Sequence, residues 1–137
     1  MLVPAKTKYR KAQKGGKKIT GFAAVGNKLS YGSFGLKALE SGRLNSKQIE
    51  SARKVITRFM KRSGKLWIMV FPHIPVTKKP AEVRMGSGKG NVEYYIAKIQ
   101  PGRVIFEIDG VENNAALESL TKAGAKLPFK TKIINLV

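Results

Sequence analysis

Cysteine is missing from this 137-residue chain, and acidic residues are scarce. The lack of cysteine excludes a thiolate metal site, a disulfide framework and a cysteine nucleophile, but leaves the redox compartment open. Only 8 Asp and Glu residues oppose 27 Lys and Arg residues, which gives a formal net charge of +19. Such an excess repels itself, so we expect a polyanionic partner, and nucleic acid fits that charge best.

Long apolar runs are also missing, and none approaches the length that would span a membrane. The first residues lack the apolar segment of a secretory signal, so we expect no such leader. The single histidine, His73, has no second His, Cys or acid at ligand spacing, which predicts neither a metal site nor a catalytic role. Apolar residues make up 42% of the chain, enough for one core, and the length predicts one domain over residues 1–137.

The positive charge is concentrated in the first half of the chain. Residues 1–65 hold 17 cations and 2 anions, whereas residues 66–137 hold 10 cations and 6 anions. Residues 1–18 form a basic N-terminal arm in which Gly15 and Gly16 interrupt any helix. Such an arm is either a solvated tail or a segment that becomes ordered on phosphate, and the sequence leaves both open. Its cations are Lys6, Lys8, Arg10, Lys11, Lys14, Lys17 and Lys18.

Residues 46–62 carry the clearest helical pattern. Asn45 is a good N-cap with Gln48 at the third helical position, and Gly64 is expected to end the helix. One face is apolar, with Ile49, Ala52, Val55, Ile56, Phe59 and Met60. The opposite face is cationic, with Lys47, Lys54, Arg58, Lys61 and Arg62. A solvated helix usually mixes charges of both signs, and only Glu50 offers an anion here, so we favour a phosphate-facing helix.

A long loop is predicted over residues 72–92, because Pro72, Pro75 and Pro80 exclude regular structure at its start. It contains the run Arg84-Met85-Gly86-Ser87-Gly88-Lys89-Gly90, which has no acid. Cations beside open glycine backbone suit a polyanion. The run is not a P-loop, because Gly90 follows the lysine and a strand follows the run.

The other segments alternate strand and helix patterns. Strands are predicted in residues 29–36, 66–71, 94–99, 104–108 and 129–137, with a hairpin at Pro101-Gly102. A second helix is predicted over residues 112–127, with Leu117, Leu120 and Ala123 inward. The aromatic residues of 19–36 and Trp67 either stack on bases or pack in the core, and we favour the core.

Several segments together resemble a known family, large-subunit ribosomal protein sixteen of bacteria, whose archaeal and eukaryotic relatives are numbered ten. The resemblance covers Met1 to about Lys132. The segments that carry it are 8–11 (Lys-Tyr-Arg-Lys), 32–38 (Gly-Ser-Phe-Gly-Leu-Lys-Ala), 48–53 (Gln-Ile-Glu-Ser-Ala-Arg), 61–68 (Lys-Arg-Ser-Gly-Lys-Leu-Trp-Ile), 71–72 (Phe-Pro), 79–86 (Lys-Pro-Ala-Glu-Val-Arg-Met-Gly), 88–90 (Gly-Lys-Gly), 101–102 (Pro-Gly) and 126–128 (Lys-Leu-Pro). Met69 and Ser87 depart from the family, which usually has a cation at the first position and often Lys at the second.

This resemblance implies an α+β fold, in which an antiparallel sheet packs against two helices, with a basic arm and a long glycine-rich loop. It implies a structural, non-enzymatic protein of the large subunit. Such a protein binds rRNA near the aminoacyl-tRNA site and central protuberance, contacts and positions tRNA, and supports late assembly. The expected partners are large-subunit rRNA, aminoacyl-site tRNA and neighbouring ribosomal proteins, with no cofactor, membrane or homo-oligomer. The expected location is the ribosome of a bacterium, a mitochondrion or a plastid.

Two sets of residues are predicted to make these contacts. The rRNA-binding set is Lys6, Lys8, Arg10, Lys11, Lys14, Lys17, Lys18, Lys47, Lys54, Arg58, Lys61, Arg62 and Lys65. The loop set, predicted to contact tRNA or rRNA, is Lys78, Lys79, Arg84, Met85, Gly86, Gly88, Lys89 and Gly90. The resemblance assigns the reach toward tRNA to Arg84, Met85, Gly86, Gly88, Lys89 and Gly90.

Two other function classes stay open at this point. An RNA-modifying or RNA-cleaving enzyme would need Glu82, Glu93 or His73 to converge on one site. A membrane-surface or chaperone-like protein could use the amphipathic helix, but its apolar face lacks Trp and is expected to pack on the sheet.

Overall fold

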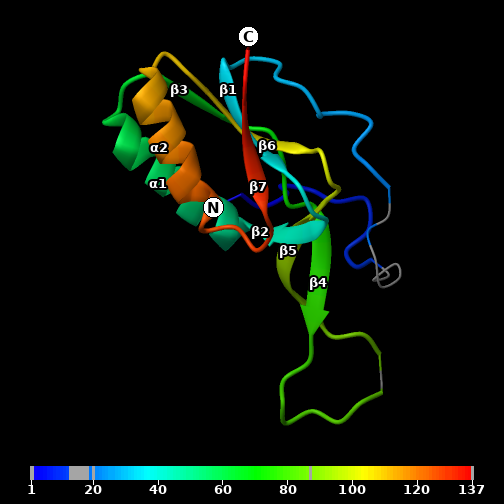
Figure 1. The fold of residues 1–137 in the computed structure, drawn as a ribbon. Helices are drawn as coiled ribbons and strands as arrows, with labels where there is room; N and C mark the ends of the chain where they lie inside the picture. Colours follow the sequence, from blue (N-terminus) through cyan, green and yellow to red (C-terminus); the bar gives the residue numbers. More distant parts are fainter. Residues whose placement is uncertain (1, 13–18, 20, 87, 137) are drawn as a thin grey trace.

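The computed structural model describes residues 2–12, 19, 21–86 and 88–136. These residues form two helices and seven strands, with both helices on the same side of the strands (Figure 1). In chain order the elements are β1 (Phe34–Ala38), β2 (Gly42–Asn45), α1 (Ser46–Met60), β3 (Lys65–Ile68), β4 (Ile74–Lys78), β5 (Asn91–Ile99), β6 (Val104–Asp109), α2 (Asn113–Gly124) and β7 (Thr131–Asn135).

The strands divide between two antiparallel sheets rather than forming the one sheet expected. A four-stranded sheet has the order β3-β6-β1-β7, and a three-stranded sheet has the order β2-β5-β4. The α+β class is confirmed. The predicted hairpin at Pro101-Gly102 is wrong, because β5 and β6 belong to different sheets. The tight turn itself is present: Arg103 N–H donates to the Gln100 carbonyl at 3.2 Å, and Gly102 has a φ of +94°.

Helix α1 begins as the sequence predicts and ends earlier. Asn45 and Gln48 form a reciprocal capping box, with side chain to backbone distances of 2.9 and 3.1 Å. The helix ends at Met60 because Lys61 adopts the left-handed conformation with a φ of +52°. The prediction that Gly64 ends the helix is therefore wrong. Gly64 is needed for close approach, since a Cβ there would lie 2.4 Å from the Asp109 carbonyl oxygen.

The core lies between the helices and the strands. Helix α1 buries Ile49, Ala52, Ile56 and Met60, while Val55 and Phe59 stay half-buried at the edge of the apolar face. Helix α2 buries a narrow stripe of Ala116, Ser119, Leu120 and Ala123. Leu117 was expected inward, but it lies off this stripe and is 43% exposed. Strand β6 is buried along most of its length and supplies Phe106 and Ile108 to the core.

A buried carboxylate fixes the segment before β1. Glu107 is fully buried, and its Oε1 accepts hydrogen bonds from three consecutive backbone N–H groups, those of Ser30, Tyr31 and Gly32, at 2.8 to 2.9 Å. Its Oε2 has no partner among the described residues. Three donors converging on one oxygen offset the cost of burying the charge and set the path of the chain over β6.

Part of the predicted 72–92 loop is a strand. Pro75 lies within β4, which is tolerated because β4 is an edge strand of its sheet. The irregular loop is shortened to residues 79–90, and it projects from the body (Figure 1). Strand β2 was not predicted, because four residues next to a helix cap carry too little pattern to identify a strand.

Candidate nucleic-acid interface

Helix α1 presents a cationic face to solvent. Lys47, Lys54 and Arg58 are exposed, as predicted. Arg53, which the sequence-based set omitted, is half-buried and bonds Glu50. This hydrogen bond lowers the pKa of Glu50 and raises that of Arg53. Over the described part of the chain it is the one ion pair, so the other cations of α1 have no carboxylate partner there.

The turn that follows α1 extends this face beyond the helix. Lys61 and Arg62 lie after the last helical residue, and both have positive φ, +52° and +63°. Residues with a Cβ seldom adopt this conformation, which costs free energy and often accompanies function. The hollow beside them has a volume of about 550 Å³ and is lined by Arg53, Lys54, Thr57, Arg58, Lys61 and Arg62. Five cations around one hollow make a site suited to phosphate.

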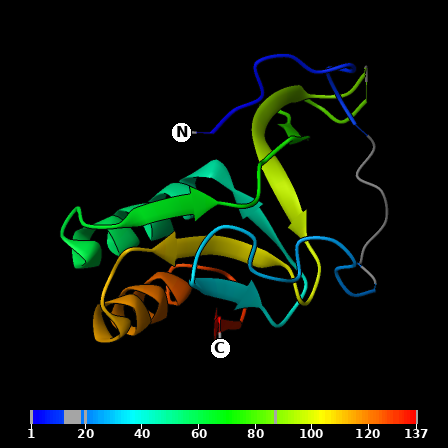
Figure 2. The ribbon, with the colours of Figure 1, turned by 90° about the horizontal axis from the view of Figure 1, so that it is seen from above.

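The N-terminal arm reaches the glycine-rich loop, an arrangement that the sequence did not reveal. Lys11 Nζ donates to the Lys89 carbonyl at 3.0 Å, and Lys89 Nζ donates in return to the Ala12 carbonyl. Figure 2 shows the arm beside the loop. Of the predicted arm cations, Lys6, Lys8 and Arg10 are exposed, whereas Lys14, Lys17 and Lys18 lie outside the described residues.

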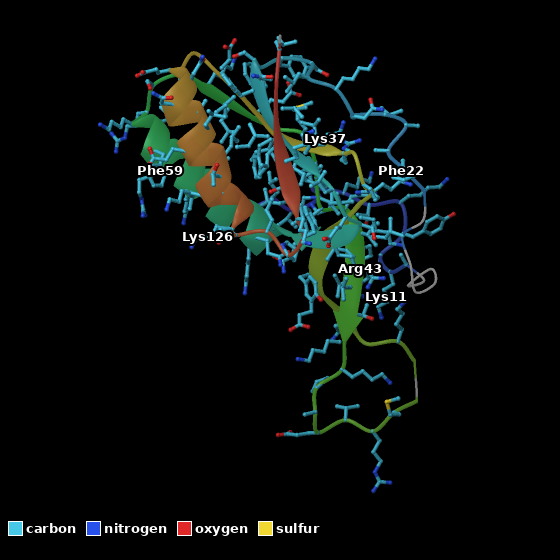
Figure 3. All side chains as sticks on the ribbon, viewed as in Figure 1. Lys11, Phe22, Lys37, Arg43, Phe59 and Lys126 are labelled. Atoms are coloured by element: carbon cyan, nitrogen blue, oxygen red, sulfur yellow. The ribbon has the colours of Figure 1, made fainter. Side chains whose placement is uncertain are left out.

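The loop of residues 79–90 is held at its base and open at its tip. Lys79 Nζ bonds the Gly86 carbonyl, and a Cβ on Gly90 would lie 2.9 Å from the Lys78 backbone. Met85 is 96% exposed, and Arg84 is exposed beside it. Gly86 and Gly88 have positive φ, and a Cβ on either would meet no atom within 4 Å among the described residues. Figure 3 shows this loop extending away from the body of the molecule.

The residues of the predicted loop set therefore lie together in the structure, but one of them, Lys78, belongs to a strand rather than to the loop. Lys78 is the last residue of β4, and Lys79 starts the loop. Arg84, Met85, Gly86, Gly88 and Lys89 all lie on the projecting part. The glycine conformations follow from the sequence, because only glycine adopts positive φ without strain. The link from Lys79 back to Gly86 leaves no trace in the sequence, because a flexible lysine has many alternatives.

An aromatic pair lies on the surface where the sequence favoured core. Tyr31 is 63% exposed and stacks on Trp67, with ring centroids 5.9 Å apart and an interplanar angle of 21°. Lys65 Nζ lies 5.4 Å from the centre of the Trp67 ring. Trp67 is half-buried on β3, and β3 is an edge strand. Of the aromatic residues in 19–36, only Phe34 is buried, and Phe22 is 82% exposed. The prediction that Tyr31 and Phe22 pack in the core is therefore wrong.

The described residues show no grouping of the kind used by metalloenzymes. No three His, Asp or Glu side chains among them are close enough to hold a metal ion. His73 is exposed, with Nδ1 3.2 Å from the Phe71 carbonyl oxygen. No helix in the described part of the chain is long and apolar enough to cross a membrane.

Comparison with known proteins decides the family. Residues 4–134 match the sequence model of the family described as Ribosomal protein L16p/L10e. The chain belongs to this family. The family resemblance predicted from the sequence is confirmed, and with it a ribosomal location. Two relatives are named large ribosomal subunit protein uL16. The relative from Rhodopseudomonas palustris strain BisA53 is 58% identical over 134 residues, and the match covers 98% of this chain and 96% of the relative. The relative from Acidiphilium cryptum strain JF-5 is 57% identical over 137 residues, and the match covers 100% of this chain and 98% of the relative.

One departure from the L16p/L10e pattern is visible in the structure. Met69 is half-buried and follows β3, and its carbonyl accepts a hydrogen bond from Arg103 Nη2 at 2.8 Å. Arg103 Nη1 also donates to the Val25 carbonyl at 3.2 Å. The guanidinium group of Arg103, in the turn before β6, therefore lies beside the residue that was expected to depart from the family pattern. The second departure, Ser87, lies outside the described residues.

Proposed function

We propose that this chain is a structural constituent of the large ribosomal subunit that binds rRNA and contacts tRNA. The observation that carries the proposal is the cationic face of α1 and the turn after it, where five cations gather around one hollow. Neutralising phosphate releases counterions and gives strong, sequence-independent binding. The two relatives described above are named as large-subunit proteins, which supports the same assignment.

The two predicted residue sets take different parts in this proposal. The arm and α1 neutralise rRNA phosphate near the aminoacyl-tRNA site and central protuberance. The loop of residues 79–90 reaches the tRNA, because Arg84 and Met85 are exposed at its tip and bare backbone is available at Gly86 and Gly88. Open N–H groups and an Arg suit the sugar and phosphate groups of RNA. Stabilising one region of rRNA in this way also supports late assembly, and the chain acts without chemistry of its own.

Arg84→Ala tests the division of labour between the loop and the body. The side chain is exposed and outside the core, so we expect normal folding and normal incorporation into large subunits. We expect elongation to slow by about tenfold, the effect of losing one charge-assisted contact. Lys122→Ala on the exposed side of α2 is the matched control and is expected to change neither. If the Arg84 variant fails to enter subunits but translates normally once inside, the roles are assigned wrongly.

A further inference from the structure

A second concave site lies away from the α1 face and the loop tip. It is a cavity of about 400 Å³ between the start of α1, the outer side of the three-stranded sheet and the base of the loop. Its volume is in the range of sites that hold small organic groups. Ala12 of the arm and Lys89 of the loop close one side, and Arg43 of β2, labelled in Figure 3, also lines it.

Two cations from neighbouring strands line this cavity. Arg43 on β2 pairs in register with Lys98 on β5, and both side chains line the site. Like charges directly opposite each other on neighbouring strands are destabilising. No carboxylate is among the residues that line the cavity, and neither cation has an ion-pair partner in the described chain. The repulsion is relieved when an anion binds between them.

The capping box gives this cavity a polar wall of donors. Asn45 and Gln48 both line it, and the side-chain oxygen of each already accepts a hydrogen bond from the backbone N–H of the other. The amide oxygens are therefore occupied, and the two NH₂ groups are left to donate. Within the described residues, no hydrogen bond from either NH₂ group is found. The wall selects groups that accept hydrogen bonds, such as carbonyl oxygens and ring nitrogens of a base.

The floor of the cavity is largely apolar. Register places Ile96 opposite Ile74 and Tyr94 opposite Val76, so these side chains share the face of the sheet that carries Lys98. Tyr94 is 41% exposed, whereas Ile96 is 6% exposed. An exposed aromatic ring beside an apolar floor is a stacking surface for a nucleobase. The site thus joins an anion position, a donor wall and a stacking ring.

We propose that this cavity holds one unstacked nucleotide of the RNA to which the chain binds. The phosphate lies between Arg43 and Lys98, the base stacks on Tyr94, and acceptor atoms of the base meet the amide groups of Asn45 and Gln48. The inference rests on the proposed rRNA binding and adds to it a pocket that captures a single nucleotide, where the α1 face contacts phosphate alone. Specific RNA recognition commonly uses bases taken out of the stack in this way.

The test uses the full chain and large-subunit particles prepared without it. Tyr94→Leu keeps an apolar side chain but removes the stacking ring. Leu117→Ala, which truncates a comparably exposed apolar side chain on α2 outside the proposed RNA-binding sets, is the control. We expect Tyr94→Leu to weaken binding roughly 10-fold with the salt dependence unchanged, because no cation is lost. Arg43→Gln is expected to reduce the slope of log affinity against log salt by about one. Ultraviolet crosslinking of the wild-type chain is expected to join the peptide containing Tyr94 to one nucleotide.

Each result separates this pocket from the general RNA-binding proposal. If the arm and α1 peptides crosslink to RNA while Tyr94→Leu binds normally and its peptide does not crosslink, the nucleotide pocket is overturned and rRNA binding stands. A crosslink from Tyr94 to a neighbouring ribosomal protein would overturn it in favour of a peptide ligand. If the wild-type chain fails to bind the particles at all, the proposed function itself is wrong. The melting temperature of each variant, expected within about 2 °C of wild type, shows that the fold is kept.

Discussion

The body of this chain is held by close packing of buried side chains, whereas the tip of the projecting loop is exposed. In the body, Phe106 and Ile108 are fully buried, and a Cβ on Gly64 would collide with the backbone of β6. In the loop of residues 79–90, Met85 is almost fully exposed, and Cβ atoms on Gly86 and Gly88 would meet nothing in the described chain. Packing determines the body, whereas the tip of the loop exposes Arg84, Met85 and the backbone at Gly86 and Gly88.

This difference separates the energy of folding from the chemistry of recognition. Burying apolar surface stabilises the body, and the exposed loop contributes little to that total. The exposed guanidinium group of Arg84 and the open glycine backbone at the loop tip are groups that a polyanion would bind. Substitutions in the body should therefore reduce the free energy of unfolding, and substitutions in the loop should affect binding or translation instead.

The sharpest contrast comes from truncating one large apolar side chain in each region. Phe106→Ala opens a cavity in the core and should lower the free energy of unfolding by roughly 3–5 kcal/mol. Met85→Ala removes a side chain that is 96% exposed and should change it by less than about 0.5 kcal/mol. Urea unfolding of the two variants measures both values. Similar losses would show that the loop packs against the body.

The buried carboxylate of the body offers the next largest effect. Glu107→Gln replaces a charged acceptor of three N–H groups with a neutral one, and should cost about 2–3 kcal/mol. Glu93→Gln, at an exposed position on β5, is the matched control and should be nearly neutral. Thermal unfolding compares them. Equal stability would mean that the three hydrogen bonds to Glu107 do not hold the segment before β1.

The stacked pair of Tyr31 and Trp67 is less buried than the core and less exposed than the tip of the loop. Trp67 is half-buried, so Trp67→Ala should cost roughly 1–3 kcal/mol, less than a fully buried ring. Tyr31→Ala removes the exposed partner of the stack and should leave the melting temperature nearly unchanged while weakening RNA binding. Calorimetry and a binding assay on the same samples separate the effects. A Tyr31 variant with wild-type RNA affinity would make the pair purely structural.

The smallest effect concerns the one ion pair of α1. The Arg53 hydrogen bond lowers the pKa of Glu50 below its ordinary value of 4.5 in the folded state. The pair therefore adds stability above pH 4.5 that is lost as the pH falls through the lowered pKa. The gain is under about 0.5 kcal/mol, because the pair is accessible to solvent. Glu50→Gln should remove this part of the pH dependence between pH 5 and 3, and an unchanged profile would contradict it.

The sequence predicted most of what local rules control. The capping box of Asn45 and Gln48, the buried face of α1 and the tight turn at Gly102 depend on neighbours within a few residues, and all three are present. The predicted helix end was wrong because Lys61 adopts a positive φ, against the preference of a residue with a Cβ. Prolines suggested a loop where β4 forms, because an edge strand tolerates them.

The features that the sequence did not predict depend on contacts between residues far apart in the chain. The three hydrogen bonds on Glu107 and the link between Lys11 and Lys89 join residues more than seventy positions apart. The division of the strands into two sheets also depends on pairings between strands that are distant in the sequence. Nothing in a sequence pattern of period two or 3.6 encodes such pairings. The nucleotide pocket was missed for the same reason, since Arg43 and Lys98 become neighbours only through the register of β2 and β5.

The most direct test of the central claim is the salt dependence of binding to large-subunit particles. Affinity of the wild-type chain should fall roughly 1,000-fold between 50 and 200 mM salt. Replacing Lys54 and Arg58 by Gln should reduce the slope of log affinity against log salt by about 1.5, whereas replacing Lys122 and Lys126 by Gln should leave it unchanged. Equal slopes for the two double variants, or affinity that does not respond to salt, would contradict phosphate recognition by the α1 face.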